Sequence, residues 1–327
     1  MMYKGYDFFP HGRRWRFMRW TTIAVAASLL VALMSLASFA LRGLNYGVDF
    51  KGGALIEVQS VSGPLDLAKI RASLNDLNIG DVQVQAVGQG NEALVRIAQQ
   101  PTEREQTEAG AKVKAALGDT ITIRRTEVVG PTVSAELKSS GIWAISLAML
   151  GILLYVWFRF EWQFAVAGVV ALCHDVLITA GMFSFLWQEF DLTTVAALLT
   201  LAGYSINDTV VFFDRVRENL RKYKKMPFTE LLDLSINETL SRTVLTAVST
   251  FTAVLALWVF GTEAIRGFAF AMLFGIVIGT YSTIFVAPPF LIWLGFKREN
   301  MIRDEAAEAG VATQSGRPAA SRSAKKV

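Results

Sequence analysis

Six long runs of apolar residues, separated by short polar segments, dominate the pattern of this 327-residue chain. A helix needs about 20 mostly apolar residues to cross the hydrocarbon core of a bilayer. The composition agrees, because 53% of the residues are hydrophobic and 18% are charged, against about a quarter in soluble domains. The pattern predicts a polytopic α-helical membrane protein with six transmembrane helices, at residues 20–40, 140–158, 163–187, 191–213, 243–261 and 267–295.

The stretch between the first two predicted helices, residues 41–139, has the pattern of a soluble domain. Apolar and polar residues alternate in four places, as in half-buried strands, and two segments have helical spacing. Thr102 and Glu105 form a capping box at the start of the second helical segment. The order strand-helix-strand-strand-helix-strand is that of a ferredoxin-like module. We therefore expect a small α+β domain, with strands at 55–59, 81–87, 93–98 and 121–129 and helices at 66–77 and 102–117.

Two polar segments remain outside these elements, a charged loop at 214–242 and a tail at 296–327. Beyond Arg303 the tail contains no aromatic residue and many Ala, Glu, Ser and Lys residues, so we expect it to be disordered. Within the loop, a predicted amphipathic helix either lies in the membrane interface or packs against its own bundle. Its apolar residues recur every four positions, at Phe228, Leu232, Ile236 and Leu240.

Positive charge is distributed unevenly between the two sides of the predicted helices. Short loops rich in Lys and Arg face the cytoplasm, and the short loops of one side contain only Arg266. Both termini, 1–19 and 296–327, are therefore predicted to be cytoplasmic, and 41–139 extracytoplasmic. The first helix is expected to be an uncleaved signal-anchor, because its apolar core exceeds that of a cleaved signal peptide. The basic residues of the cytoplasmic side are Lys4, Arg13, Arg14, Arg16, Arg19, Arg159, Arg215, Arg217, Arg221, Lys222, Lys224, Lys225, Lys297, Arg298 and Arg303.

Asp208 is an ionisable residue inside the fourth predicted helix. A charged side chain at the centre of a bilayer costs about 2.5–3.5 kcal/mol on insertion scales. Such residues carry ions, protons or substrate, or they are paired inside a helix bundle. Two interpretations stay open at this point: Asp208 is a proton carrier, or it belongs to an ion pair that holds helices together.

Four further polar residues are candidates to act with Asp208. Asn207 is its neighbour in sequence, and Arg242 begins the fifth predicted helix at a similar depth. Arg242 is either a counter-charge for Asp208 or an interfacial residue that obeys the positive-inside rule. His174 and Asp175 lie midway along the third helix. Since histidine titrates near neutral pH, this pair is either part of a proton relay or a structural hydrogen-bonded pair.

The sixth predicted helix carries a stripe of small residues at Gly267, Ala271, Gly275 and Gly279. Small residues let helix backbones approach closely, so we interpret the stripe as a packing surface that is exposed for a second membrane protein. Pro288–Pro289 should kink or end this helix. Cys173 is the only cysteine, which excludes an intrachain disulfide.

Common enzyme and metal motifs are missing from the sequence. It contains neither a Gly-x-x-x-x-Gly-Lys-Ser/Thr loop nor a His-Glu-x-x-His site, and its histidines are His11 and His174. We therefore expect no enzyme activity, no cofactor and no metal ion. Nothing in the sequence indicates a nucleic acid partner.

Five short segments resemble the SecD/SecF family of bacterial protein-export subunits, in particular its SecF members. Each segment alone is weak evidence, but together they are specific, and the resemblance covers roughly residues 10–300. Six spans with a domain after the first also resemble one half of a resistance-nodulation-division (RND) transporter. The five segments are Val48–Gly53, Glu127–Pro131, His174–Asp175, Gly203–Asn219 and Asn237–Thr243.

The resemblance implies a subunit of the bacterial inner membrane that uses the proton-motive force to assist the export of unfolded preproteins. The implied partners are SecD, which would supply the other half, the SecYEG channel, the SecA motor, YajC and the lipid bilayer. The membrane aspartate and arginine of the family correspond to Asp208 and Arg242. Two alternatives remain: a scaffold subunit in which these two residues form a structural pair, and half of a small-molecule exporter.

Overall fold

Six helices of the computed structural model are long and apolar enough to cross a membrane, within the residues that it describes (15–60, 63–77, 79–87, 90–117 and 121–296). The predicted class, a polytopic helical membrane protein, is thereby confirmed. The tail predicted to be disordered lies almost entirely outside the described residues. The helices are α1 (Thr21–Arg42), which follows the short η1 (Phe17–Trp20), then α5 (Pro131–Arg159), α6 (Trp162–Leu186), α7 (Leu192–Lys222), α8 (Phe228–Phe260) and α9 (Glu263–Phe285), which is followed by α10 (Ala287–Trp293).

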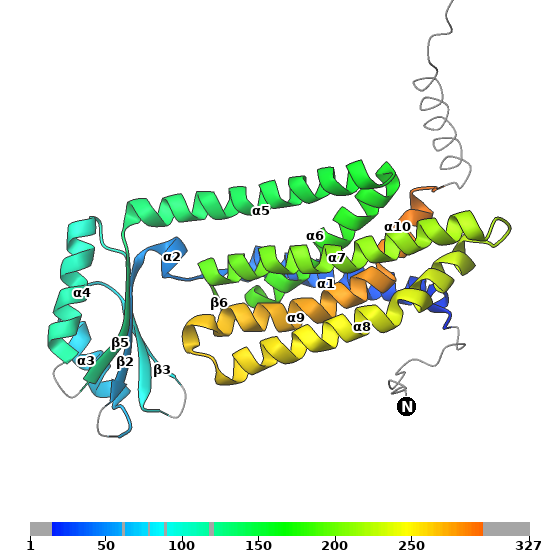
Figure 1. Ribbon diagram of the computed structural model, residues 1–327. Coiled ribbons are helices and arrows are strands. Elements are labelled where there is room, and N and C mark those ends of the chain that lie inside the picture. Colours follow the sequence, from blue (N-terminus) through cyan, green and yellow to red (C-terminus); the bar gives the residue numbers. More distant parts are fainter. Residues whose placement is uncertain (1–14, 61–62, 78, 88–89, 118–120, 297–327) are drawn as a thin grey trace, which may run out of the picture.

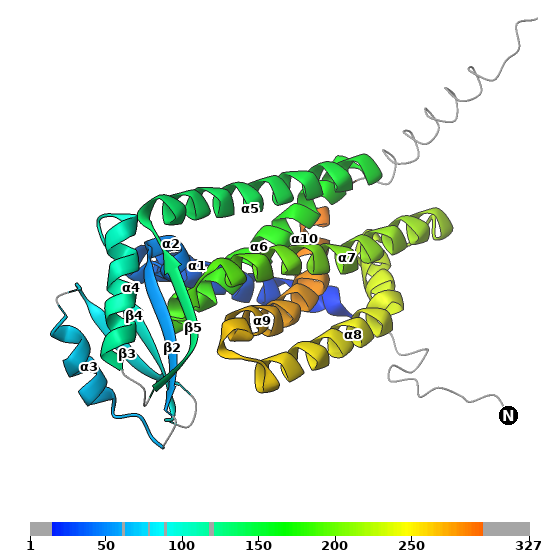
Figure 2. The same ribbon diagram turned by 60° about the vertical axis from the view of Figure 1, so that its left-hand side comes forward.

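Three of these helices, α6, α7 and α9, form the centre of the bundle (Figure 1). α9 packs against both α6 and α7, and side chains such as Leu201 and Ile276 are buried between them. α1, α5 and α8 lie on the outside and expose large apolar side chains, as expected of surfaces that face lipid. Figures 1 and 2 both show α5 running along the edge of the bundle.

The small-residue stripe of α9 packs inside this chain, so the expectation that it is exposed for another protein is wrong. Ala271, Gly275 and Gly279 are buried. A Cβ atom at Gly275 would lie 2.4 Å from Cδ2 of Leu201 on α7, and one at Gly279 would lie 3.2 Å from Ser205. The stripe therefore lets α9 approach α7. The prediction at Pro288–Pro289 is confirmed, because α9 ends at Phe285 and α10 begins with these prolines in its first turn.

The charged loop predicted at 214–242 is mostly helical. α7 continues to Lys222, and α8 begins at Phe228 and runs unbroken to Phe260. Leu231, Leu232 and Ile236 are buried in the core of the bundle, so the predicted amphipathic helix is the first part of α8 and packs against its own bundle. The residues near η1 hold it there, since the backbone N–H of Met18 donates to Asp233 at 2.9 Å.

The predicted α+β domain forms between α1 and α5. It consists of β2 (Gly53–Ser60), α3 (Leu67–Asn75), β3 (Val82–Val87), β4 (Glu92–Ile97), α4 (Glu103–Leu117) and β5 (Ile121–Val129). The sheet is antiparallel with the order β3-β4-β2-β5, as in a ferredoxin-like module. Thr102 acts as the predicted N-cap, because its hydroxyl accepts a 3.2 Å hydrogen bond from the backbone N–H of Glu105. α3 and α4 lie on the face of the sheet that points away from the bundle (Figure 1).

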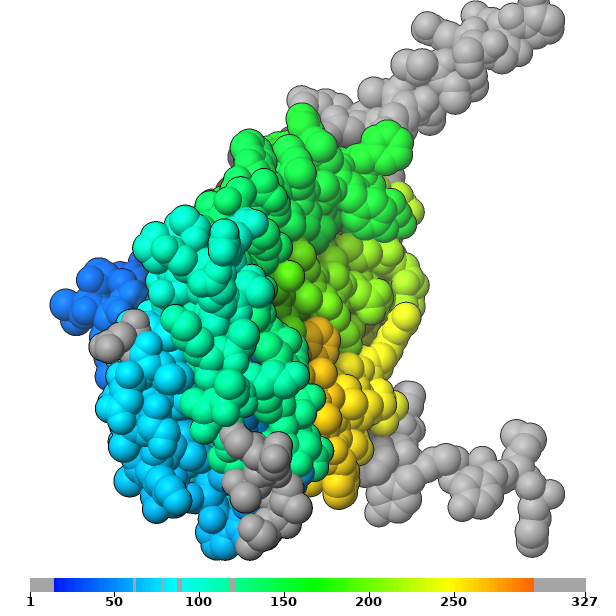
Figure 3. Space-filling view, turned by 90° about the vertical axis from the view of Figure 1, so that its left-hand side faces the viewer, coloured from blue at the N-terminus to red at the C-terminus, as the bar shows by residue number. Residues whose placement is uncertain are grey.

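A short junction joins this domain to the bundle. β1 (Asn45–Tyr46) pairs in parallel with β6 (Glu189–Phe190), and α2 (Val48–Lys51) leads into β2. Gly52 and Gly53 follow α2 with φ angles of 72° and 121°, a region that favours glycine. At Gly53 a Cβ atom would lie 2.4 Å from the carbonyl oxygen of Ile97, so only glycine fits. Figure 3 shows the α+β domain in front of the end of the bundle.

Polar contacts at the junction reach the start of α7. The backbone N–H of Leu192 donates to Asp49 at 2.8 Å, and Arg96 of β4 forms an ion pair with Glu189 of β6. Burial raises the pKa of Glu189, and the opposing attraction of Arg96 does not cancel this effect. The α+β domain is therefore connected to the first turn of the helix that carries Asp208.

Candidate functional site

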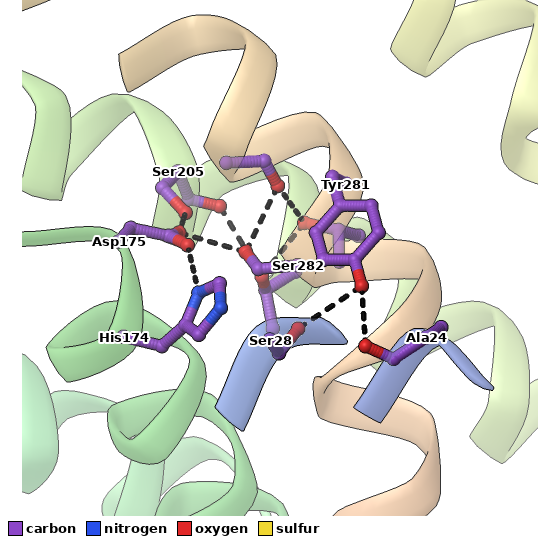
Figure 4. Close-up of polar contacts among 10 residues, drawn as sticks. Ala24, Ser28, His174, Asp175, Ser205, Tyr281 and Ser282 are labelled. Atoms are coloured by element: carbon purple, nitrogen blue, oxygen red, sulfur yellow. Dashed lines mark hydrogen bonds and ion pairs between the residues drawn. The ribbon is translucent and has the colours of Figure 1, made fainter. Parts of the chain in front are cut away.

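Asp175 on α6 is fully buried, and three polar side chains surround its carboxyl group (Figure 4). Its Oδ2 accepts hydrogen bonds from the hydroxyls of Ser205 on α7, at 2.6 Å, and Ser282 on α9, at 2.7 Å. Its Oδ1 lies 2.9 Å from Nδ1 of His174, which donates when that nitrogen carries the proton. One carboxyl group thus joins the three central helices.

His174 extends this network to α1. Its ring stacks on Tyr281 of α9, with the ring centroids 6.3 Å apart. The Tyr281 hydroxyl donates to the carbonyl oxygen of Ala24 at 2.7 Å and accepts from Ser28 at 3.0 Å. Figure 4 shows these side chains between the helices. Nε2 of His174 is buried and finds no hydrogen-bond partner among the residues that the structure describes.

Asp208 on α7 has a different environment, one helical turn after Ser205. It is buried, with 6% of its surface exposed. Within the described part of the chain, its carboxyl group makes no hydrogen bond and no ion pair of 4 Å or less. The next residue, Thr209, is satisfied, because its hydroxyl donates to the Ser205 carbonyl oxygen and lies 3.1 Å from the hydroxyl of Thr283. The bundle therefore surrounds Asp208 without binding its carboxyl group.

Arg242 on α8 is the cation that faces Asp208. It is close enough for an electrostatic interaction with the carboxyl group, although it is exposed and does not form a direct ion pair with it. The buried hydroxyl of Tyr204 lies near Thr246 and Thr250 of α8, one turn from Asp208. The boundary between α7 and α8 is thus a polar strip inside a membrane bundle.

The five residues selected from the sequence separate into three groups. His174 and Asp175 are hydrogen-bonded to each other in the network. Asp208 and Arg242 interact electrostatically without a direct ion pair. Asn207 is exposed on the outer side of α7. Tyr281 and Ser282 belong to the network but are not predicted from the sequence. In the sequence, only their position two and three residues after Gly279, the last residue of the small-residue stripe, points to these side chains.

Comparison with known protein families identifies the family of this chain. The family model described as "Protein export membrane protein SecD/SecF, C-terminal" matches residues 109–297, which is more than half of the chain. The chain belongs to the SecD/SecF family. A second model, for the "SecD/SecF GG Motif", matches residues 37–62. That segment contains Gly52 and Gly53, whose backbone geometry and close packing exclude side chains.

Relatives named "Protein translocase subunit SecF" match most of the chain. The relative from Cereibacter sphaeroides is 47% identical over 290 residues, which cover 86% of this chain and 89% of the relative. The relative from Rhodobacter capsulatus is 42% identical over 316 residues, which cover 90% and 93%. The chain therefore has nearly the full extent of these SecF relatives.

Two solved SecDF structures share the fold. The crystal structure of SecDF from Thermus thermophilus matches with a TM-score of 0.77 and 36% identity, over 87% of this chain and 39% of that chain. SecDF in a "Super-membrane-facing form" matches with a TM-score of 0.64 and 35% identity, over 93% and 41%. This chain thus corresponds to less than half of the SecDF structures.

Proposed function

We propose that this chain is a SecF-like subunit that works with SecD to assist protein export through the SecYEG channel, driven by the proton-motive force. Asp208 is the group that gains and releases the proton. The observation that carries this proposal is the contrast between two buried carboxyl groups: Asp175 has three polar partners and Asp208 has none of comparable geometry among the described residues.

The energies are compatible with this role. An ionised carboxylate without hydrogen bonds is costly in a membrane interior, so a proton or an added partner stabilises it. Arg242 stays charged, because guanidinium does not deprotonate in proteins, and it favours the ionised form of Asp208 from a distance. One proton that crosses 100 mV gains about 2.3 kcal/mol. That is enough to shift a conformational equilibrium whose states differ by a few kcal/mol.

A SecD partner is supported by the outer face of α7. Thr200, Gly203 and Asn207 are exposed along one side of this helix, and Arg242 is exposed on neighbouring α8. Small and polar residues suit contact between helices better than contact with lipid. The SecDF structures contain an additional length of chain beyond the part that matches here, and a separate SecD would occupy that place.

The remaining assignments follow from the same proposal. The protein lies in the bacterial inner membrane with both termini in the cytoplasm and the α+β domain in the periplasm, as the Lys and Arg distribution predicts. SecA drives, and YajC accompanies, the complex that moves the unfolded preprotein. The alternative is a scaffold subunit, favoured by the Asp175 network, which joins four helices by hydrogen bonds and ring stacking alone.

The test compares Asp208→Asn with the wild type in membrane vesicles that contain SecD, SecYEG and SecA. Asparagine has nearly the same shape and cannot ionise, so the complex should assemble while most of the stimulation of export by the proton-motive force is lost. Asp76→Asn, the same change at an exposed position of the α+β domain, is the control and should behave as wild type. An Asp208→Asn complex that keeps its full response to the proton-motive force would support the scaffold function instead.

A further inference from the structure

A polar pocket lies where the corner between α5 and α6 meets the last turns of α7. Figure 1 shows that this end of the bundle points away from the α+β domain. Its volume is about 520 Å³. None of its residues belongs to the networks around Asp175 or Asp208. They are Arg159, Asp214, Arg217, Glu218, Arg221 and Lys222.

The pocket has an excess of positive charge, since four of its residues are cations and two are carboxylates. One carboxylate is already used outside the pocket, because Glu218 accepts a 2.6 Å bond from Arg215. Asp214 pairs with Arg159 at 2.8 Å. Arg215 also pairs with Glu238 at 2.8 Å, and Glu161 lies 3.6 Å from Arg217. Counting these three neighbours lowers the excess from two positive charges to one.

Contacts to the protein hold part of this cationic surface in place. Arg217 donates to the carbonyl oxygen of Arg159 at 3.2 Å, and its guanidinium lies over the ring of Phe160. Nε of Arg217 is buried without a hydrogen-bond partner in the described part of the structure. A positioned guanidinium is suited to bind a phosphate group.

Three exposed aromatic side chains lie close in sequence to the pocket residue Arg159. Phe158 is 95% exposed, Trp157 59% and Trp162 51%, and all three lie within three residues of Arg159 at the α5–α6 corner. Tryptophan and other aromatic residues collect at the depth of the lipid headgroups. The pocket therefore lies where a headgroup phosphate would be, with apolar surface of α5 beside it for an acyl chain.

We propose that this pocket binds the phosphate of an anionic phospholipid. Basic pockets between transmembrane helices suit anionic headgroups in this way. A free phosphate ion presents the same charge to the arginines, but it makes no use of the exposed aromatic surface. The lipid is therefore the ligand, and its headgroup ties the α5–α6 corner to the end of α7.

The chain offers a matched control, because Lys224 and Lys225 lie just beyond α7 and line a different surface hollow. Arg221→Gln/Lys222→Gln and Lys224→Gln/Lys225→Gln remove the same charge from the same end of the bundle. The full-length protein in detergent is titrated with dioleoylphosphatidylglycerol, and native mass spectrometry measures the first binding event. Dioleoylphosphatidylcholine serves as the neutral lipid, and inorganic phosphate as the free anion.

We expect Arg221→Gln/Lys222→Gln to weaken the first phosphatidylglycerol binding event about thirtyfold, on the basis of the usual contribution per basic residue near a membrane surface. The control pair should change it less than about twofold. Lys222→Gln alone should weaken binding about fivefold. Its ammonium group lies over the ring of Tyr223. The Lys222→Gln single variant tests the lipid site if the double variant does not fold.

Three results would overturn the proposal. Equal losses in both double variants would mean that general surface charge attracts the lipid. Equal affinity for phosphatidylcholine would mean that the headgroup phosphate and net charge are not recognised. Displacement of phosphatidylglycerol by inorganic phosphate at equal concentration would assign the pocket to a free anion.

Discussion

At the scale of single residues, the two carboxyl groups in the centre of the membrane bundle differ in their hydrogen bonding. Asp175 is held by two serine hydroxyls and His174, so a change in its protonation would disturb contacts to several helices. Asp208 lies one turn beyond Ser205 and lacks such contacts in the described structure. A proton can therefore join or leave Asp208 with fewer hydrogen bonds to rearrange.

Arg242 should matter through its charge more than through its shape. It does not form the bidentate pair with Asp208 that only a guanidinium can make. We expect Arg242→Lys to retain at least about half of the export stimulated by the proton-motive force, and Arg242→Met to lose most of it. Vesicle export assays measure both. Equal loss in the two variants would mean that the guanidinium itself is required.

Glu189 gives a prediction outside the membrane helices. Burial raises its pKa in the folded protein, so the folded chain holds this proton more tightly than the unfolded chain. The protonated form of Glu189 therefore stabilises the folded protein. This stabilisation is complete below the ordinary glutamate pKa, about 4.3, and is lost as the pH rises through the raised pKa of Glu189 in the folded chain. Glu189→Gln cannot ionise and should melt like the wild type near pH 4 but at a higher temperature at pH 8.

Thermal melting of the purified protein at the two pH values measures this difference. Glu105→Gln, at an exposed position of α4, is the control for loss of one carboxylate. A wild type that is more stable than Glu189→Gln at pH 8 would mean that the attraction of Arg96 outweighs the cost of burial.

The sequence identifies charged residues of the site but not their neutral partners. Asp208, Arg242, His174 and Asp175 stand out because charge is rare in apolar segments. Ser282 resembles any other hydroxyl of a membrane helix until the rotation of α9 relative to α6 is known. Asn207 was selected as the neighbour of Asp208, but adjacent residues on a helix point about 100° apart, and it faces outward.

At the scale of elements, hydropathy marks where a helix becomes polar, not where it ends. The apolar run of α7 ends near Phe213, but the helix continues for more than two turns to Lys222. α8 likewise begins at Phe228, well before the apolar segment predicted from residue 243. The charged residues between the two apolar runs belong to the ends of α7 and α8, which is why hydropathy alone predicts a loop there.

The close contact of α9 with α7 predicts a sharp effect of a single methyl group. Gly275→Ala would place its Cβ 2.4 Å from Leu201, whose side chain is fully buried and has little room to move. Overpacking of this kind costs about 1–3 kcal/mol. Gly275→Ala should lower the melting temperature, and Leu201→Val in the same chain should restore part of the loss.

Gly151→Ala is the matched control for this contact, since no side chain of the described residues lies within 4 Å of a Cβ at that position of α5. It should leave the melting temperature unchanged or slightly raised, because alanine is the better helix former. A loss in Gly275→Ala that Leu201→Val does not reduce would show that the α7–α9 contact adjusts elsewhere.

At the scale of the whole molecule, the sequence predicts both parts of the protein but not how they meet. Alternation and helical spacing reveal the strands and helices of the α+β domain, because these are local patterns. The contacts of Arg96 with Glu189 and of Asp49 with Leu192 join residues far apart in sequence. Nothing local distinguishes those residues from other surface charges.

The Arg96–Glu189 pair should hold the α+β domain against the bundle. Arg96→Glu would place a second carboxylate beside Glu189, where Asp49 and Asp191 already add negative charge. We expect the amide groups of β1 and β6 to exchange hydrogen about tenfold faster in this variant, since two partly buried carboxylates at this site repel each other. The reversed pair, Arg96→Glu/Glu189→Arg, should recover most of the protection.

Arg104→Glu provides the comparison, because its pair with Glu108 lies on the surface of α4 with the arginine side chain 89% exposed. Exposed pairs contribute little, so exchange at β1 and β6 should not change. If Arg96→Glu also left that exchange unchanged, the strand pairing and the hydrogen bond between Leu192 and Asp49 would be enough to hold the junction. If the reversed pair failed to recover protection, the effect of Arg96→Glu would come from its packing rather than its charge. The expected recovery would identify the ion pair as the contact through which the domain and the first turn of α7 respond to each other.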